Sequence, residues 1–304
     1  MMMMTSSDPW SDRATLPGPP SPDSSALVHA LIDGRYRVRS VLGEGSTATV
    51  YEVTDAETGR DGALKLMHRR ARLRNARERF VREAEMLARL KHPNVVRIDG
   101  AGVWNERLYI LMELLDGEPL SDLLGPPQHR QLPAPMAVGV FGQAAMGLAA
   151  AHAAGVVHRD VKPANLVLLD NGKRLKVIDF GLARDTTLAG ALTDSGVVLG
   201  SPAYMAPERL AGGAEPDPRW DVWSLGVCLY EALAGRYLYR GTEWKQVAKQ
   251  IRRSIPRPLR RIRPDLPPEL CQLAHRMITK PVASRPKNMV EVASELAAIG
   301  RDLG

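Results

Sequence analysis

The sequence predicts an α+β fold with two lobes, a strand-rich first lobe with one main helix and a mainly helical second lobe. Its 304 residues suit one large domain or two modest ones. Short β-type runs fill most of residues 35–114, whereas apolar stretches of helical length follow residue 116. We place the first lobe at 34–115 and the second at 116–300. A flexible Ser/Pro-rich tail is expected at 1–33 and a short end at 301–304.

The local patterns justify the elements in order. Strands are expected around a glycine-rich turn and directly after it, because each run is short and bounded by turn residues. One amphipathic helix is expected at 71–90, where apolar residues recur three or four positions apart and His92-Pro93 ends the pattern. The predicted strands are 35–42, 49–54, 62–67, 95–101, 107–114, 166–169 and 175–178, and the predicted buried helices are 136–154 and 220–233.

Composition and charge exclude several classes of protein. Charged residues make up 25% of the chain and hydrophobic residues 44%, which argues against global disorder and against a coiled coil. The net charge is +7, and two arginine-rich stretches stand out at 69–79 and 252–263. Neither interleaves aromatic residues, and prolines interrupt the second, so we interpret both as solvated faces and expect no nucleic-acid partner. Docking of an acidic partner is the alternative.

Two cysteines, Cys228 and Cys271, are too few for a disulfide framework or a four-ligand metal site. Both lie in apolar stretches of helical character, so we expect reduced, structural thiols. The N-terminus lacks the basic stretch and apolar run of a signal peptide. The longest apolar run, residues 144–157, is shorter than the roughly 18 residues of a spanning helix. The sequence thus predicts no membrane span and a cytoplasmic location.

The glycine-rich turn at residues 43–50 reads Gly-Glu-Gly-Ser-Thr-Ala-Thr-Val. Glycines let the backbone come close to phosphate oxygens, which exposed amide groups can bind. A purely structural hairpin is the alternative, and Ala48 stands where the usual pattern has a third glycine. A dinucleotide-binding loop is excluded, because that fingerprint opens a helix whereas residues 50–53 continue as a strand.

One lysine, Lys65, lies inside the apolar strand that follows. Its ammonium group must find a partner, because an unpaired charge is costly to remove from water. Glu83 in the predicted helix is on the same side as the apolar face and can supply that partner. Considered alone, a surface lysine and a surface glutamate are the simpler interpretation.

Polar residues at fixed spacing follow the first buried helix. Residues 158–165 read His-Arg-Asp-Val-Lys-Pro-Ala-Asn, and Asp179-Phe180-Gly181 follows the next strand pair. Phosphoryl transfer needs an acceptor for a hydroxyl proton, a cation near the transferred group and oxygen ligands for Mg²⁺. These two segments contain all of them, so they indicate a phosphotransferase.

Together these motifs resemble those of the eukaryotic-type protein kinases, and most closely the bacterial serine/threonine kinases of that fold. The resemblance runs from about Tyr36 to Ile299 and includes Ala206-Pro207-Glu208 and residues 221–226, in the family's order. It implies an ATP-dependent protein serine/threonine kinase that transfers the γ-phosphate to Ser and Thr hydroxyls. ATP and Mg²⁺ are the implied cofactors, with Mn²⁺ as an alternative to Mg²⁺. Proteins with Ser or Thr are the implied substrates, and the oligomeric state stays open.

The resemblance also implies roles for individual residues. Asp160 would be the catalytic base and Lys162 would neutralise charge on the transferred phosphate. Asn165 and Asp179 would bind the metal, and Glu83 would position Lys65. The implied ATP-binding residues are Leu42, Gly43, Glu44, Gly45, Ser46, Thr47, Ala48, Val50, Ala63, Lys65, Glu83, Met112, Glu113, Leu115 and Val167.

Regulation and support are implied in the same way. Arg159 would pair with a phosphorylated residue of the activation loop, and Thr193 and Ser195 are the expected autophosphorylation sites. Glu208 would pair with Arg285. Asp221 would hold the catalytic loop from beneath, and His158 and Phe180 would stack within a hydrophobic spine.

Two further classes of function compete with this interpretation. A pseudokinase scaffold would bind partners without turnover, but Lys65, Asp160, Asn165 and Asp179 are all intact. A small-molecule phosphotransferase could share the catalytic loop, yet residues 200–208 and 221–226 resemble the peptide-positioning segments of protein kinases. Ala164 lacks an acidic side chain that could read a basic substrate residue, so substrate preference stays open.

Overall fold

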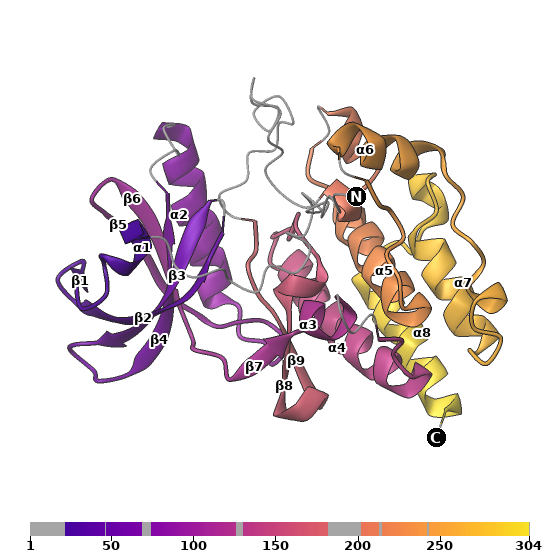
Figure 1. Ribbon diagram of the computed structural model, residues 1–304, viewed down its shortest axis with the longest axis horizontal. Helices are drawn as coiled ribbons and strands as arrows, with labels where there is room; N and C mark the ends of the chain where they lie inside the picture. The colour runs from indigo at the N-terminus through magenta and orange to yellow at the C-terminus, as the bar shows by residue number, and fades with distance from the viewer. Residues whose placement is uncertain are drawn as a thin grey trace, which may run out of the picture.

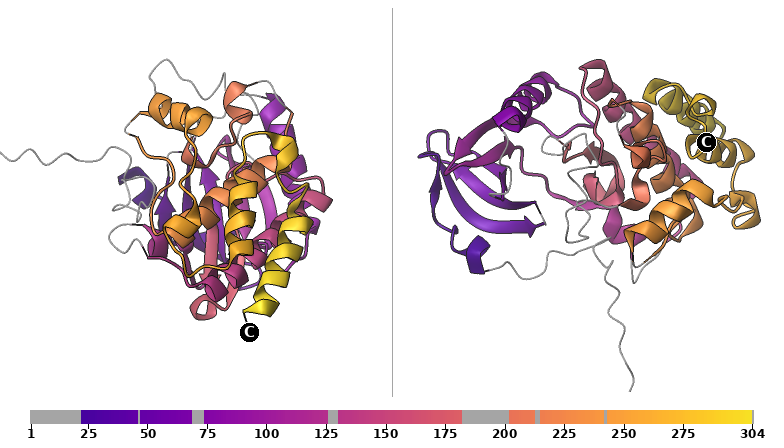
Figure 2. Two further views of the ribbon diagram at one scale, coloured as in Figure 1. Left: turned by 90° about the vertical axis from the view of Figure 1, so that its right-hand side faces the viewer. Right: turned by 90° about the horizontal axis from the view of Figure 1, so that it is seen from above.

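The protein folds into two lobes, as predicted. The structure is a computed structural model that describes residues 22–45, 47–68, 74–125, 130–181, 202–212, 215–241 and 243–303. The strand lobe lies on the left of Figure 1 and the helical lobe, ending in orange and yellow, on the right. The ribbon seen from above in Figure 2 shows the same division.

The first lobe is built on one antiparallel sheet. Its strands follow the order β1-β2-β3-β4-β6-β5. The helix α2 (Arg74–Arg89) packs against β5. The strands are β1 (Leu31–Ile32), β2 (Tyr36–Glu44), β3 (Ala48–Asp55), β4 (Asp61–Met67), β5 (Ile98–Trp104) and β6 (Arg107–Met112).

Alternation of side chains divides the apolar residues of this sheet between two cores. In β3, Tyr51 and Val53 are buried in a small cluster with Val38 and Leu64. The opposite side contributes to the main core, which Leu87 of α2 joins. This sidedness fixes the strand register, because a shift by one residue would turn the apolar set toward solvent.

Two predicted boundaries differ in the structure. The flexible tail predicted at 1–33 is wrong for residues 22–33, because apolar side chains such as the fully buried Ile32 pack this segment onto the sheet, with a short helix, α1 (Pro22–Ser25), at its start. Residues 1–21 lie outside the described part of the chain. The strand predicted at 95–101 begins only at Ile98, because Val95 forms a single bridge to Val177 in the other lobe.

The second lobe is mainly helical. A small antiparallel sheet, β7-β8-β9, carries the loops of the candidate site, and the long helix α4 packs against α8, α5 and β9. Its strands and helices are β7 (Gly117–Pro119), α3 (Leu120–Leu124), α4 (Ala134–Ala153), β8 (Leu166–Leu169), β9 (Arg174–Val177), α5 (Arg219–Ala234), α6 (Trp244–Arg253), α7 (Pro268–Met277) and α8 (Met289–Asp302). Short 3-10 turns are η2 (Pro163–Asn165), η3 (Asp170–Gly172), η5 (Pro202–Tyr204), η6 (Arg209–Ala211), η7 (Leu259–Arg261) and η8 (Val282–Ser284).

Helix α4 is apolar on more than one face because it is a core helix of this lobe. Within the described residues it is the one helix whose length and composition would fit a membrane span, and 56% of its most apolar window is buried inside the protein. Phe141 and Leu148 are fully buried there. Cys228 and Cys271 are free and buried, and burial raises the pKa of both thiols, as expected for structural cysteines.

Candidate active site

The loop between α4 and β8 gathers three of the predicted functional side chains. The Lys162 ammonium lies 3.4 Å from the Asp160 carboxylate. The Asn165 side-chain amide donates to the Asp160 carbonyl at 2.8 Å and to its carboxylate at 3.3 Å. The Asp160 backbone amide in turn donates to the His158 ring at 3.2 Å. Asp160 is thus held from both sides, with its carboxylate beside a cation.

Asp221, at the start of α5, holds this loop from beneath, as predicted. Its carboxylate accepts backbone hydrogen bonds from His158 at 2.8 Å and Arg159 at 2.9 Å, and the His152 ring lies at 2.8 Å. Burial would raise the pKa of Asp221, but these hydrogen bonds and the nearby histidines hold it below the usual value. A fully buried carboxylate therefore stays charged and fixes the backbone on which Asp160 stands.

Lys65 and Asp179 form an ion pair between the two lobes. The structure contradicts the predicted pair of Lys65 with Glu83. Glu83 instead accepts a hydrogen bond from the Arg159 guanidinium at 3.0 Å. Lys65 and Arg159 are both largely buried, with side-chain exposures of 16% and 13%. A buried cation needs a carboxylate partner, and here Asp179 serves Lys65 while Glu83 serves Arg159.

The backbone is strained at two of these residues. Arg159 has φ of 66° and Asp179 has φ of 63°, in the left-handed region that residues with side chains rarely adopt. Such strain persists only where the surroundings enforce it, and it concentrates at functional sites. Two hydrogen bonds help to hold this backbone in place. The Arg159 amide donates to the Asp221 carboxylate, and the Gly181 amide donates to the His158 carbonyl at 3.0 Å.

The donor chemistry beside Asp160 fits a hard divalent cation. Asn165 makes its side-chain bonds to Asp160 through nitrogen, which leaves its amide oxygen for a metal, and Asp179 adds a carboxylate. Such ions prefer oxygen ligands and retain bonds to water and phosphate. Among the described residues no cluster of three or more His, Cys, Asp or Glu could hold a metal alone. The two residues therefore fit a metal whose other ligands come from a nucleotide and water.

The glycine-rich turn connects β2 and β3 above Lys65. The hairpin stays paired up to Glu44 and Thr49, and the Gly45 amide donates to the Ala48 carbonyl at 2.9 Å. Val50 pairs with Lys65 across β3 and β4, which places the lysine beneath the hairpin. Gly43 and Thr47 also lie in the described part, whereas Ser46 lies outside it.

The apolar members of the implied ATP-binding set lie on both lobes. Ala63 pairs with Met112 across β4 and β6, and Val167 is buried in β8 of the other lobe. Leu42, near the turn end of β2, exposes 41% of its surface, and the partly buried Leu115 packs against the main core. The set therefore provides apolar surface from β2, β4, β6 and β8.

Glu113 acts through its side chain as a link between the lobes. Its carboxylate accepts from the Lys176 ammonium at 2.5 Å and from the Arg97 amide at 2.7 Å. Its own amide donates to the Arg97 carbonyl at 3.0 Å. Any contact of Glu113 with a nucleotide would therefore use its backbone carbonyl, since the amide and the carboxylate are engaged.

Two supporting predictions are confirmed by the geometry. Arg285 and Glu208 form two parallel hydrogen bonds of 2.8 Å, with the Arg285 side chain fully buried and stacked over Trp223 at 4.9 Å. The rings of His158 and Phe180 lie 4.6 Å apart in the core. The predicted phosphorylation sites Thr193 and Ser195 lie outside the described residues.

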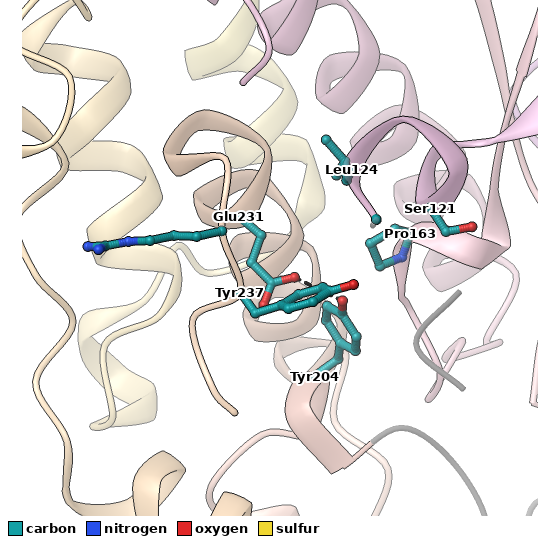
Figure 3. Close-up of a pocket in the computed structure, with 8 residues that line it drawn as sticks. Ser121, Leu124, Pro163, Tyr204, Glu231 and Tyr237 are labelled. Carbon is teal, nitrogen blue, oxygen red and sulfur yellow. Dashed lines mark hydrogen bonds between the residues drawn. The ribbon is translucent and has the colours of Figure 1, made fainter. Parts of the chain in front are cut away.

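A small cavity lies under the catalytic loop (Figure 3). Its volume is about 10 Å³, the space of one water molecule. Tyr204 points toward Glu231 and donates to its carboxylate at 2.8 Å, and the Leu238 amide donates to the same group at 2.8 Å. Pro163 comes from the catalytic loop side. The cavity is too small for a nucleotide, and the buried Glu231 joins α5 to the segment around Tyr204.

Sequence reasoning missed several residues of the site. Lys176 reaches Glu113, Arg209 donates to the Arg159 carbonyl, and the Ser24 hydroxyl donates to Glu44 at 2.8 Å. Lys176 and Arg209 stand in ordinary polar positions, and Ser24 falls in a segment whose composition predicts a tail. No local pattern marks these contacts, because each joins residues far apart in the chain.

The chain is similar in sequence and in structure to known proteins. Residues 36–296 match the protein kinase domain family. The chain is 37% identical over 288 residues to the serine/threonine-protein kinase pkn2 of Myxococcus xanthus, covering 91% of this chain and 33% of that protein. It is 36% identical over 279 residues to the serine/threonine-protein kinase PknL of Mycobacterium tuberculosis, covering 91% and 68%. The crystal structure of a mutant PknI kinase domain from Mycobacterium tuberculosis superposes with a TM-score of 0.71 at 28% identity, covering 91% of this chain and 98% of that one.

Proposed function

Because this chain belongs to the protein kinase family, with a serine/threonine kinase domain of the bacterial type, we propose that its catalytic loop performs the phosphoryl transfer. The observation that carries the proposal is the joining of Asp160, Lys162 and Asn165 in one hydrogen-bonded loop. Asp179 lies at the end of the neighbouring strand and contacts Lys65 of the other lobe. The chain spans a third of pkn2 and two thirds of PknL, so the activity is proposed for this domain.

The proposed step uses each side chain in a defined way. The Asp160 carboxylate accepts the proton of a substrate Ser or Thr hydroxyl as its oxygen bonds to the γ-phosphorus of ATP. The bond from that phosphorus to the β,γ-bridging oxygen breaks, and ADP leaves with the electron pair. Lys162 stabilises negative charge on the transferred group, and its position beside Asp160 supports this role.

Mg²⁺ is the proposed metal, with Mn²⁺ as an alternative. When bound, the ion neutralises charge on the phosphates and orients them. Asn165 and Asp179 would hold it through oxygen atoms, which both ions accept. Asp179 would then exchange its contact with Lys65 for the metal, and the lysine ammonium would turn to phosphate oxygens.

Activation by phosphorylation is the third part of the proposal. Phosphate on Thr193 or Ser195 would attract Arg159, since phosphate accepts charge-assisted hydrogen bonds from guanidinium groups. Arg159 now pairs with Glu83, so its recruitment would free Glu83 for Lys65. Phosphopeptide mapping after incubation with ATP and Mg²⁺ tests the sites. Absence of phosphate from both residues would overturn the assignment.

An acidic segment of a protein substrate is the proposed docking partner. Lys245, Lys249, Arg252 and Arg253 share one exposed face of α6 and line, with Trp244, an open hollow of about 450 Å³. Among the described residues no acidic side chain pairs with Lys245, Lys249 or Arg253. Charge complementarity therefore favours an anionic peptide.

The hollow is also connected to the catalytic loop. Arg252 donates to the Leu210 carbonyl at 2.7 Å, and the adjacent Arg209 donates to the Arg159 carbonyl, one residue before Asp160. A substrate bound on α6 would thus be held by elements fixed to the catalytic loop. Labelled octaglutamate should bind the wild type and bind at least tenfold more weakly when Lys245 and Lys249 are both changed to glutamate. The control variant is Lys287→Glu. The proposal would be contradicted if octaglutamate bound the wild type and the double variant equally. A preference of the wild type for a DNA oligonucleotide of equal charge would contradict it as well.

A cytoplasmic location is proposed as well. Two buried free thiols support it, because reducing compartments keep cysteines in this state. Fractionation of cells that express the chain would test it. Recovery of the chain mainly with membranes or outside the cell would contradict it.

Labelled ATP with the wild type and Asp160→Asn tests the catalytic proposal. We expect labelled protein in the wild type and a loss of about 10²- to 10⁴-fold in the variant. Asp116→Asn, at an exposed position, is the matched control. No label in the wild type would favour a scaffold, and label on a metabolite alone would favour a small-molecule phosphotransferase.

A further inference from the structure

The N-terminal segment before β2 contacts that strand at both of its ends. The Ala30 carbonyl accepts from the Val38 amide at 3.0 Å, and β1 pairs with the start of β2. Helix α1 lies at the other end of β2, where Ser24 contacts Glu44 of the glycine-rich turn. This segment therefore runs from the hairpin to the far end of the sheet.

Ser24, in α1, joins the segment to the glycine-rich turn. Its hydroxyl donates to the Glu44 carboxylate at 2.8 Å, and Glu44 stands between the two glycines of the turn. Ser24 exposes only 4% of its surface, and the Tyr51 hydroxyl donates to its carbonyl at 3.3 Å. The donor is thus fixed by burial and by a second hydrogen bond. A bond from a hydroxyl to a carboxylate is stronger than one between neutral groups.

The other strand of the hairpin is tied in a similar way. Thr49, opposite Glu44 in the register, lies with its hydroxyl 3.1 Å from the His68 ring nitrogen. The hairpin is therefore held on both strands, and the turn between them is closed by the Gly45 to Ala48 hydrogen bond. A turn ordered before binding loses less entropy when it closes over phosphates.

We propose that Ser24 is a positioning residue for nucleotide binding, which acts through Glu44 to preorganise the glycine-rich turn. The inference rests on the proposed binding of ATP beneath this turn. It assigns a role to a segment upstream of residues 36–296, the part that matches the kinase family. The hydrogen bond from Ser24 to Glu44 is made by the N-terminal segment of this same chain.

Direct nucleotide binding tests the proposal. A fluorescent ATP analogue with Mg²⁺ is titrated into Asp160→Asn protein, which separates binding from turnover. We expect Ser24→Ala to bind the analogue roughly three- to tenfold more weakly, because the variant loses one hydrogen bond to a charged group and water replaces that bond only in part. Ser24→Thr keeps the hydroxyl and should bind within about twofold of the parent. Ser25→Ala, at the neighbouring exposed position, is the matched control and should not change binding.

Steady-state kinetics and a double-mutant cycle separate positioning from a general structural role. In the active protein, Ser24→Ala should raise KM for ATP while kcat and KM for a peptide substrate stay within about twofold. In the Glu44→Ala background, Ser24→Ala should weaken binding no further, because the contact through which Ser24 acts is already absent. Binding by Ser24→Ala within twofold of the parent, an equal loss in Ser24→Thr, or additive effects of Ser24→Ala and Glu44→Ala would overturn the proposal. Failure of the parent to bind the analogue would instead contradict the proposed function.

Discussion

The Glu83 carboxylate accepts a hydrogen bond from the Arg159 guanidinium at 3.0 Å, so this carboxylate of α2 is bound to the catalytic loop. Lys65 pairs with Asp179 in its place. The structure thus holds two exchanged ion pairs, each linking the strand lobe to the catalytic segments. Glu83 can reach its proposed place beside Lys65 only after it separates from Arg159. Asp179 can bind the proposed metal only after it separates from Lys65.

Removing the Arg159 guanidinium should weaken control by phosphorylation. In Arg159→Ala, Glu83 loses its present partner and can reach Lys65 without a phosphate to compete for the arginine. We expect the unphosphorylated variant to be more active than the unphosphorylated wild type, and phosphorylation to add less than threefold. Kinase assays before and after phosphatase treatment measure both values. Arg82→Ala, exposed on the same helix as Glu83, is the control. An unphosphorylated variant no more active than the wild type would contradict the exchange.

Changing Asp179 should alter the requirement for metal more than the affinity for peptide. Asp179→Asn keeps the shape but loses the charge that favours a divalent cation. The Mg²⁺ concentration for half-maximal activity should rise at least tenfold, with KM for peptide little changed. Asp170→Asn, on the exposed turn between β8 and β9, provides the comparison. The same Mg²⁺ dependence in both variants would remove Asp179 from the metal site.

Breaking the Arg285–Glu208 pair should cost stability without touching the chemistry. Arg285→Ala leaves Glu208 without its bidentate partner, and removal of one member of a buried pair costs about 3–5 kcal/mol. Arg276→Ala is a matched control, because its side chain is 45% exposed and its ion pairs lie at the surface, where the loss is below about 1 kcal/mol. Denaturant unfolding compares the two variants. Similar losses in both would show that the buried pair contributes little.

The stability of the helical lobe should fall below neutral pH partly through His275. Burial lowers the pKa of His275 from 6.5, and its ring accepts a hydrogen bond from the Leu259 amide at 3.0 Å, which requires the neutral form. Since the unfolded state binds the proton more readily, this contribution is complete above about pH 6.5 and is lost as the pH falls.

Thermal unfolding of wild type and His275→Gln at pH 7.5 and 5.5 measures this contribution. The variant should lose less stability between the two values. Burial lowers the pKa of His92 as well, so a residual dependence on pH is expected in the variant. An unchanged dependence would show that His275 is not responsible.

The sequence predicted the main elements and located the motifs from which the candidate site is argued, because those signals are local. The spacing of residues 158–165 and the glycines at 43 and 45 are readable without coordinates. Strand β5 begins three residues after the predicted start at residue 95, since Val95 has strand character but forms its bridge with Val177 of the other lobe. The ordered segment at 22–33 was missed because its composition predicts a tail.

By itself, the amino-acid order determined which chemical groups the protein has and in which loops and strands they stand. The partner of each charge was decided by tertiary structure: Lys65 with Asp179, Glu83 with Arg159, Ser24 with Glu44. Each pair joins residues from different elements, and several acids lie within reach of each cation. Which pair forms depends on distance and burial in the folded chain, and local sequence patterns contain neither.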